Sequence, residues 1–163
     1  QHVKEQCLKE ERVHYMETKV RENCYGTTPR NIVLETIESG KLGKFNYILF
    51  LDDDNMLLEP ALYNISQSIV NNNKPPLIWH DIVFTNKFQT KYSIMPKNDV
   101  PLIERDFDGL NCIFRSDVIY GMRFTKSYNH DFLFAQQASE KVNNQWIKCE
   151  GIGGIHCLSW DTY

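Results

Sequence analysis

The sequence lacks an apolar run long enough to cross a membrane, an excess of positive charge, and the paired cysteines of a zinc site. A membrane-spanning helix needs about 20 consecutive apolar residues, and no segment approaches that length. The net charge of −3 and the pI of about 6.0 argue against nucleic acid as a partner. The hydrophobic fraction of 42% and the aromatic fraction of 12% instead fit a soluble globular protein.

The five cysteines are odd in number, irregularly spaced and form no Cys-x-x-Cys pair. This pattern favours a reducing compartment, and hence a cytoplasmic protein, over a zinc site or a disulfide framework. One disulfide between Cys149 and Cys157 stays open as an alternative. Asn64-Ile65-Ser66 matches a glycosylation sequon, but it falls within a predicted helix, so we interpret it as a chance match.

The chain of 163 residues is long enough for one domain, without repeats or linkers. It begins without Met and without a signal peptide, so we expect a piece of a longer protein. Helical and alternating apolar patterns predict a layered α/β fold with a mixed, mainly parallel central sheet. The predicted helices cover residues 1–11, 28–39, 59–70 and 129–142, with a helical turn before Gly121, and the predicted strands cover residues 13–20, 45–51, 77–85, 91–96 and 146–157 and begin the segment 110–121.

The stretch YILFLDDDNM, residues 47–56, places three aspartates directly after an apolar strand. On an extended segment Asp52 and Asp54 face one side, roughly 7 Å apart, and Asp53 faces the other. Carboxylates this close raise each other's pKa unless a cation neutralises them, and Mg²⁺, Mn²⁺ and Ca²⁺ prefer such oxygen ligands. Ligands of open α/β sheets bind beyond the carboxyl ends of strands, which is where the aspartates fall.

Three other interpretations of the aspartates are weaker. A helix-capping cluster needs one such residue and not three. An EF-hand loop counted from Asp52 requires Gly and Glu where Leu57 and Tyr63 stand. An aspartate-nucleophile phosphatase usually has Thr or Val at the fifth position of its motif, where this chain has Met56. That motif follows the first strand of the fold, whereas here a predicted strand and a predicted helix precede the aspartates.

Three segments together resemble GT-A-fold glycosyltransferases: TTPRNIVLETIESGKLGKFNYILFLDDDN with its Asp-x-Asp motif, YNHDFLFAQQA with an acidic residue at a helix start, and the terminal GGIHC. The similarity in order and spacing covers roughly residues 13–157. The small size and the Asn-, Lys- and Ile-rich composition resemble compact enzymes of large algal viruses, which implies a host cytoplasm. The family opens with a β-α-β unit that holds the nucleobase, and we expect this chain to lack that portion.

The resemblance implies roles for individual residues. Asp131 is the candidate general base, with His130 as its substitute or neighbour, while an acidic residue in a first helical turn also has a purely structural use. His156 is either a metal ligand or an ordinary histidine at a strand end. Arg30 meets the donor or is a surface residue. The implied metal ligands are Asp52, Asp54 and His156, for Mn²⁺ or Mg²⁺, and the implied donor-binding residues are Arg30, Asp52, Asp53, Asp108 (or Asp106) and Asn111.

The predicted function is metal-dependent transfer of a hexose from a nucleoside-diphosphate sugar, UDP-linked as first choice, to a hydroxyl of a glycan or protein-linked glycan. With Asp131 as base the reaction inverts the anomeric configuration, while a retaining reaction stays open. Trp79 and His80 are candidates for an acceptor platform, and the alternative for Trp79 is the core. A nucleotidyltransferase is a second possibility, although its Gly-rich phosphate loop with Lys is missing. A non-catalytic, metal-dependent carbohydrate-binding remnant is a third.

Overall fold

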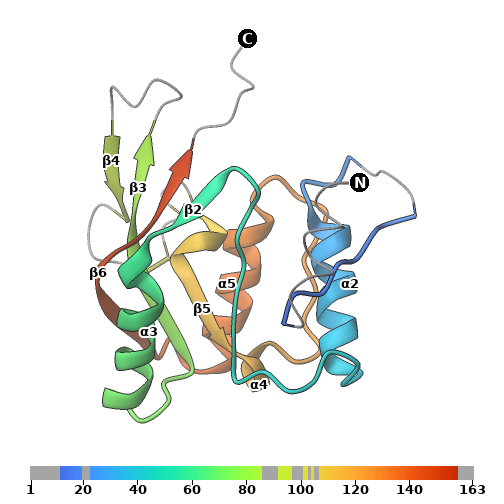
Figure 1. Cartoon of the computed structure of the whole chain (residues 1–163), viewed down its shortest axis with the longest axis horizontal. Coiled ribbons are helices and arrows are strands. Elements are labelled where there is room, and N and C mark those ends of the chain that lie inside the picture. Colours follow the sequence, from blue (N-terminus) through green and yellow to red (C-terminus); the bar gives the residue numbers. More distant parts are fainter. Residues whose placement is uncertain are drawn as a thin grey trace.

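The computed structural model describes residues 12–19, 23–85, 92–96, 101–102, 104 and 107–157. Within them, six strands form one sheet in the order β1-β5-β3-β6-β2, with β4 paired to β3 (Figure 1). The strands are β1 (Tyr47–Leu49), β2 (Asn55–Leu57), β3 (Leu77–Thr85), β4 (Tyr92–Met95), β5 (Cys112–Arg115) and β6 (Trp146–Cys157). The helices are α2 (Thr27–Glu38), α3 (Glu59–Asn71), α4 (Ser116–Ile119), α5 (His130–Lys141) and the 3₁₀ turn η2 (Gly109–Asn111).

The predicted mixed α/β class is confirmed, but the expectation of a mainly parallel sheet is wrong. Of the five pairings between described strands, only β3 with β6 is parallel. The cause is β5, which lies between β1 and β3 and runs antiparallel to both. The first and third strands along the chain therefore share a direction without touching.

One edge of β3 has two successive partners. Its residues Leu77–Trp79 pair with β5, and Ile82–Thr85 pair with β4. Between these two pairings, His80 contacts η2. Nε2 of His80 lies 2.6 Å from the backbone oxygen of Leu110, and the carbonyl of His80 accepts a hydrogen bond from the Asn111 side chain. The segment before β5 is thereby fixed against the middle of the sheet.

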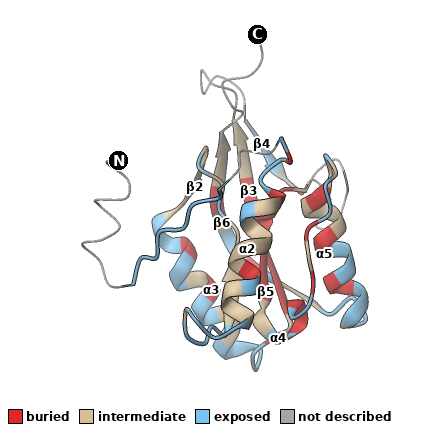
Figure 2. Ribbon diagram, turned by 90° about the vertical axis from the view of Figure 1, so that its right-hand side faces the viewer, coloured by how far each residue is buried: buried red, intermediate tan, exposed pale blue. Residues whose placement is uncertain are grey.

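Helices cover both faces of the sheet (Figures 1 and 2). Because side chains of a strand alternate, Leu77 and Trp79 pack on one face with α2 and α5, while Ile78 packs on the other face with α3. The first cluster is the larger, and the buried residues in Figure 2 follow β3, β5 and the inner sides of the helices. Its members include Leu34, Cys112, Phe114, Phe134, Ala135 and Ala138.

Several predicted elements are confirmed. The segments 77–85 and 91–96 form the expected hairpin of β3 and β4, and β6 spans residues 146–157 as predicted. Helix α3 begins with Pro60 in its first turn, where a missing N–H costs nothing, and Asn64 of the sequon lies within it. Helix α5 follows Asn129, although that side chain makes no capping hydrogen bond.

Other predictions at element level are wrong. Residues 13–18 form no strand and are exposed, and the strand predicted at 45–51 is reduced to the half-buried β1 because it lies at the edge of the described sheet. Thr28 is not a cap, since α2 starts at Thr27 behind Gly26. Leu62 is exposed on α3, whereas Ile65 is buried. The predicted helix at 1–11 lies outside the described residues.

The described cysteines Cys24, Cys112 and Cys149 are buried and free. The alternative of a Cys149–Cys157 disulfide is wrong, because both residues lie on strand β6, where Lys148 and Cys157 pair with Trp79 and Thr85 of β3. Those six steps along β3 span about 20 Å, against less than about 7 Å between the Cα atoms of a disulfide. None of the helices in the described part of the chain is long and apolar enough to cross a bilayer.

Candidate functional site

The acidic run lies in a tight turn between β1 and β2. The backbone N–H of Asn55 donates to the carbonyl of Asp52 at 3.1 Å, and Asp53 and Asp54 form the turn between them. The expected alternation of the three carboxylates along an extended strand is therefore wrong. The turn leads directly into β2, whose first residue, Asn55, is the register partner of His156 in β6. Sheet pairing thus brings the aspartates to the terminal histidine.

His156 faces Asp108. Its Nδ1 lies 2.8 Å from Oδ2 of Asp108, and its ring stacks on that of Phe84 with centroids 4.0 Å apart. The approach is not aligned as a hydrogen bond, so Nδ1 remains a buried polar atom without a hydrogen-bond partner. Burial opposes protonation of the ring, but the carboxylates of Asp108, Asp54 and Asp52 outweigh it and raise the pKa of His156.

Asp108 is held in place by the turn that it caps. Its Oδ1 accepts a hydrogen bond of 2.8 Å from the N–H of Leu110, and Asn111 returns the contact by accepting from the N–H of Asp108 at 2.9 Å. Burial alone would raise the pKa of Asp108, but the His156 ring and the Leu110 N–H more than offset it, so that pKa lies below its usual value. A buried carboxylate is thereby kept ionised.

The pKa of Asp54 is shifted in the opposite direction to that of Asp108, above its usual value. Burial is the main cause that raises its pKa, and repulsion from Asp52 and Asp53 adds to it, while His156 acts against it. A further positive charge beside Asp54 would therefore stabilise the ionised form of this carboxylate.

Arg30 connects the acidic turn to the start of α5. Its guanidinium donates to Asp131 Oδ1 at 2.6 Å, to His130 Nε2 at 2.6 Å, and to Asp52 Oδ1. It also lies over the ring of Phe124, 5.3 Å from the centroid, and its side chain is only 12% exposed. The surface alternative for Arg30 is wrong, because this largely enclosed side chain bridges two carboxylates.

The tautomer of His130 follows from its two contacts. Nδ1 lies 2.9 Å from the carbonyl oxygen of Ser127, so it carries the proton and donates. Nε2 then accepts from Arg30, which is always protonated. In this arrangement His130 is neutral and its lone pair is occupied, so it orients the arginine and is not available as a base.

Asp131 lies over Gly109, where a side-chain carbon would meet its carboxyl group at 3.2 Å. Burial raises the pKa of Asp131, and the charges of Asp108 and Asp52 act in the same direction, whereas the charge of Arg30 opposes them. A carboxylate with a raised pKa in a partly enclosed site is better matched to proton transfer near neutral pH than an ordinary aspartate.

No known family model matches this chain, and no curated protein matches it either.

The donor atoms of the acidic turn and β6 suit a divalent cation in kind. Two buried polar atoms without hydrogen-bond partners, Asn55 Oδ1 and His156 Nδ1, belong to register partners at this corner, beside the carboxylates of Asp54 and Asp108. Oxygen ligands with one imidazole nitrogen fit Mn²⁺ or Mg²⁺. Within the described residues, however, no three His, Cys, Asp or Glu side chains are arranged as a ready metal-binding cluster.

Several predicted site residues lie elsewhere or have other partners. Asn111 is fully buried, and both ends of its amide are bonded within the protein, so it supports Asp108 from behind. Asp53 is exposed in the turn. Trp79 and His80 are buried in the sheet, which contradicts the acceptor platform expected there. Asp106 lies outside the described residues.

The fold brings to the site further residues that the sequence did not indicate. Asn55 adjoins Asp108, Tyr25 lies beside His130, and Tyr128 contacts Tyr25. Asn55 follows the aspartates directly, so adjacency to a motif was an available signal. Nothing in the sequence pairs Tyr25 with Tyr128.

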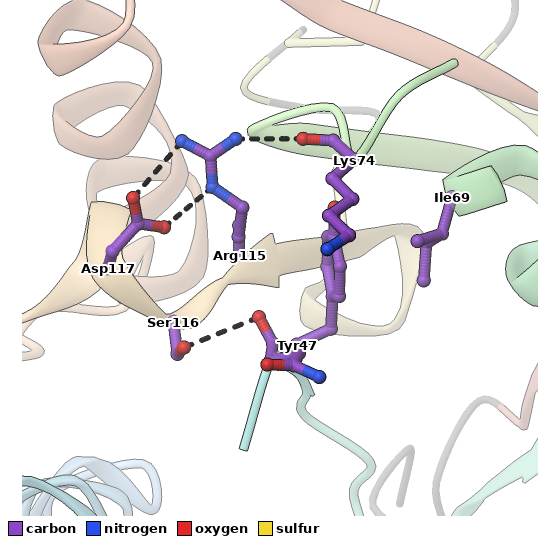
Figure 3. A pocket seen from close by; sticks show the side chains of 7 residues that line it. Tyr47, Ile69, Lys74, Arg115, Ser116 and Asp117 are labelled. Atoms are coloured by element: carbon purple, nitrogen blue, oxygen red, sulfur yellow. Dashed lines mark hydrogen bonds and ion pairs between the residues drawn. The ribbon is translucent and has the colours of Figure 1, made fainter. Parts of the chain in front are cut away.

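A separate cavity of about 500 Å³ lies at the other end of β1, between Tyr47, Ile69 and Arg115 (Figure 3). Arg115 is already engaged there, donating to Asp117 at 2.7 Å and to the carbonyl of Lys74 at 2.8 Å. This cavity contains none of the predicted site residues, so the acidic corner and the cavity are distinct places on the protein.

Proposed function

We propose that the protein is a metal-dependent glycosyltransferase of the GT-A kind, which transfers a hexose from a nucleoside-diphosphate sugar, UDP-linked as first choice, to a glycan hydroxyl. The observation that carries the proposal is the convergence of three separate segments. The acidic turn after β1, His156 of β6 and Asp131 of α5 carry the three motifs of the resemblance, and Arg30 and Asp108 connect them.

The relation between His156 and Asp108 supports a cation at this corner. Nδ1 of His156 and Oδ2 of Asp108 lie 2.8 Å apart but are not aligned to form a hydrogen bond, so both atoms would be available to one ion. Asp54, Asn55, Asp108 and His156 are the residues that would hold the ion, with the donor diphosphate completing the shell. When bound, the ion would stabilise charge on the leaving diphosphate.

Asp131 has the part of general base in this proposal. It accepts the proton of the acceptor hydroxyl as that oxygen forms a bond to the anomeric carbon. The bond from that carbon to the diphosphate oxygen breaks, and its electron pair leaves with the phosphate. Attack from the side opposite to the leaving group inverts the configuration. Arg30 keeps Asp131 and Asp52 at a fixed separation, and neutral His130 keeps Arg30 in place.

The test is a panel of UDP-, GDP- and dTDP-hexoses, each with Mn²⁺ or with EDTA. Thermal shift measures binding, since a ligand that binds only the folded state raises its apparent stability. Release of the nucleoside diphosphate measures turnover. We expect one donor to bind and react only with Mn²⁺, and Asp131→Asn to keep binding while turnover falls by about 10²- to 10⁴-fold.

Asp117→Asn is the matched control, because Asp117 pairs with Arg115 at the separate cavity. Metal-dependent donor binding without turnover would instead support the non-catalytic carbohydrate-binding protein. Absence of donor binding in the presence of Mn²⁺ would refute both.

A further inference from the structure

Two exposed tyrosines, Tyr25 and Tyr128, lie next to the candidate site. Tyr25 precedes α2, the helix of Arg30, and Tyr128 precedes α5, the helix of Asp131. They are 62% and 85% exposed, and their rings meet edge to face with centroids 5.9 Å apart and an interplanar angle of 87°. We infer that this pair is an aromatic platform that binds a pyranose ring of the acceptor glycan, an inference that rests on the proposed function.

The platform is continuous with the site. The Tyr25 ring is stacked on His130, with centroids 6.4 Å apart and an interplanar angle of 21°. His130 in turn contacts Arg30, which donates to Asp131. His130 and Arg30 therefore connect the tyrosine pair to the carboxylate that would take the proton from an acceptor hydroxyl.

The backbone supports a use for the Tyr25 ring. Tyr25 has a φ of 51° in the left-handed region, followed by Gly26 at 76°. Bulky residues rarely adopt that conformation, and strained positions concentrate at functional sites. Thr27 holds the turn by donating from both its N–H and its hydroxyl to the carbonyl of Cys24, at 3.0 and 2.8 Å. The turn is thus fixed, and it directs an aromatic side chain to solvent where Gly or Asn would be cheaper.

The chemistry of the pair matches a neutral sugar. A pyranose has an apolar face of C–H groups and a rim of hydroxyls, and a tyrosine offers an apolar ring with a hydroxyl that both donates and accepts. Two rings at nearly a right angle form a corner that contacts one face and one edge of a ring-shaped ligand. The tyrosine pair also offers an exposed aromatic surface to an acceptor, which Trp79 and His80 do not, because those two side chains are buried in the sheet.

Direct binding tests the platform without any donor. The probes are maltotriose, cellotriose and chitotriose, and saturation-transfer NMR on the full chain measures contact with the protein. We expect at least one probe to bind the wild type, to bind about tenfold more weakly to the double variant Tyr25→Ala/Tyr128→Ala, and to keep most of its affinity for Tyr25→Phe/Tyr128→Phe, which retains both rings. Tyr63→Ala is the matched control, since Tyr63 is 66% exposed on α3 and away from the site.

Kinetics gives the second measurement. In a transfer assay with the probe that binds, each single alanine variant should raise the acceptor KM by about fivefold, with a smaller change in kcat, and Tyr63→Ala should leave KM as in the wild type. If none of the probes binds the wild type, or if the double variant binds as the wild type does, the platform is refuted. If probes bind the tyrosines but no donor reacts, the glycosyltransferase proposal fails and the saccharide platform stands.

Discussion

Arg30 and Asp131, which are 101 residues apart in the sequence, are joined by a hydrogen bond of 2.6 Å. The same guanidinium reaches Asp52 at the end of β1 and His130 at the start of α5. One buried cation therefore compensates two carboxylates that come from different elements, and it determines how the acidic turn lies relative to the candidate base.

Replacing Arg30 by Met should destabilise the protein by about 3 kcal/mol, because Asp131 is left buried without its partner. Urea unfolding at pH 7, followed by far-UV circular dichroism, measures the change. Arg123→Met is the control, since Arg123 pairs with Glu38 and Glu35 but is 33% exposed, and exposed pairs contribute about 1 kcal/mol or less. Equal losses for the two variants would contradict the role given to Arg30.

The pair of Asp108 and His156 should make stability depend on pH in both directions. The pKa of Asp108 is lowered by folding, so its contribution is present above the unfolded value of 3.8 and is lost as the pH falls through the folded value. The pKa of His156 is raised by folding, so its contribution is present below 6.5 and is lost as the pH rises through the folded value. Stability from this pair is therefore greatest between about pH 4 and 6.5.

Thermal unfolding of the metal-free protein from pH 3 to 9 measures this dependence. His156→Gln should flatten the alkaline side of the curve, because glutamine does not titrate, and His14→Gln, in the exposed segment 12–19, should not. An alkaline side that is unchanged by His156→Gln would show that other groups dominate there.

Metal binding should release protons if the proposed cation site is correct. Because the carboxylates raise the pKa of His156, part of its population is protonated near neutral pH, and a cation can bind only the neutral ring. Titration calorimetry with Mn²⁺ in two buffers of different ionisation enthalpy counts the protons. We expect up to about one proton per ion near pH 7, and none for His156→Ala. Binding of Mn²⁺ without any difference between the buffers would exclude His156 as a ligand.

The elements that the sequence predicted well are those specified by local signals. Pro60 and the apolar spacing marked α3, and the β-branched and aromatic run of residues 77–85 marked β3. The three motif segments also led to Asp54, Asp131 and His156, which the fold gathers at one corner. Local chemistry was sufficient for α3 and β3, because each depends on neighbours in the chain, whereas Asp131 and His156 were indicated only by the resemblance.

The remainder depended on pairing between distant segments. Strand β2 has only three residues and exists because β6 lies beside it, so no periodicity could mark it. The prediction of a mainly parallel sheet was wrong because β5 lies between β1 and β3, and the order of strands along the chain does not reveal this. Arg30 was expected on the donor or at the surface, and its bridge between Asp52 and Asp131 follows only from the tertiary arrangement.

Gly153 of β6 should tolerate no side chain, because a methyl group there would overlap the buried ring of His80. His80 cannot move away, since its Nε2 lies 2.6 Å from the carbonyl of Leu110 in the turn that Asp108 caps. Gly153→Ala should therefore cost about 3 kcal/mol of unfolding free energy. The double variant Gly153→Ala/His80→Ala should be more stable than the sum of the two single losses predicts, by about 1–2 kcal/mol, because shortening His80 removes the overlap. Additive losses in urea unfolding would mean that the two residues do not contact each other in this way.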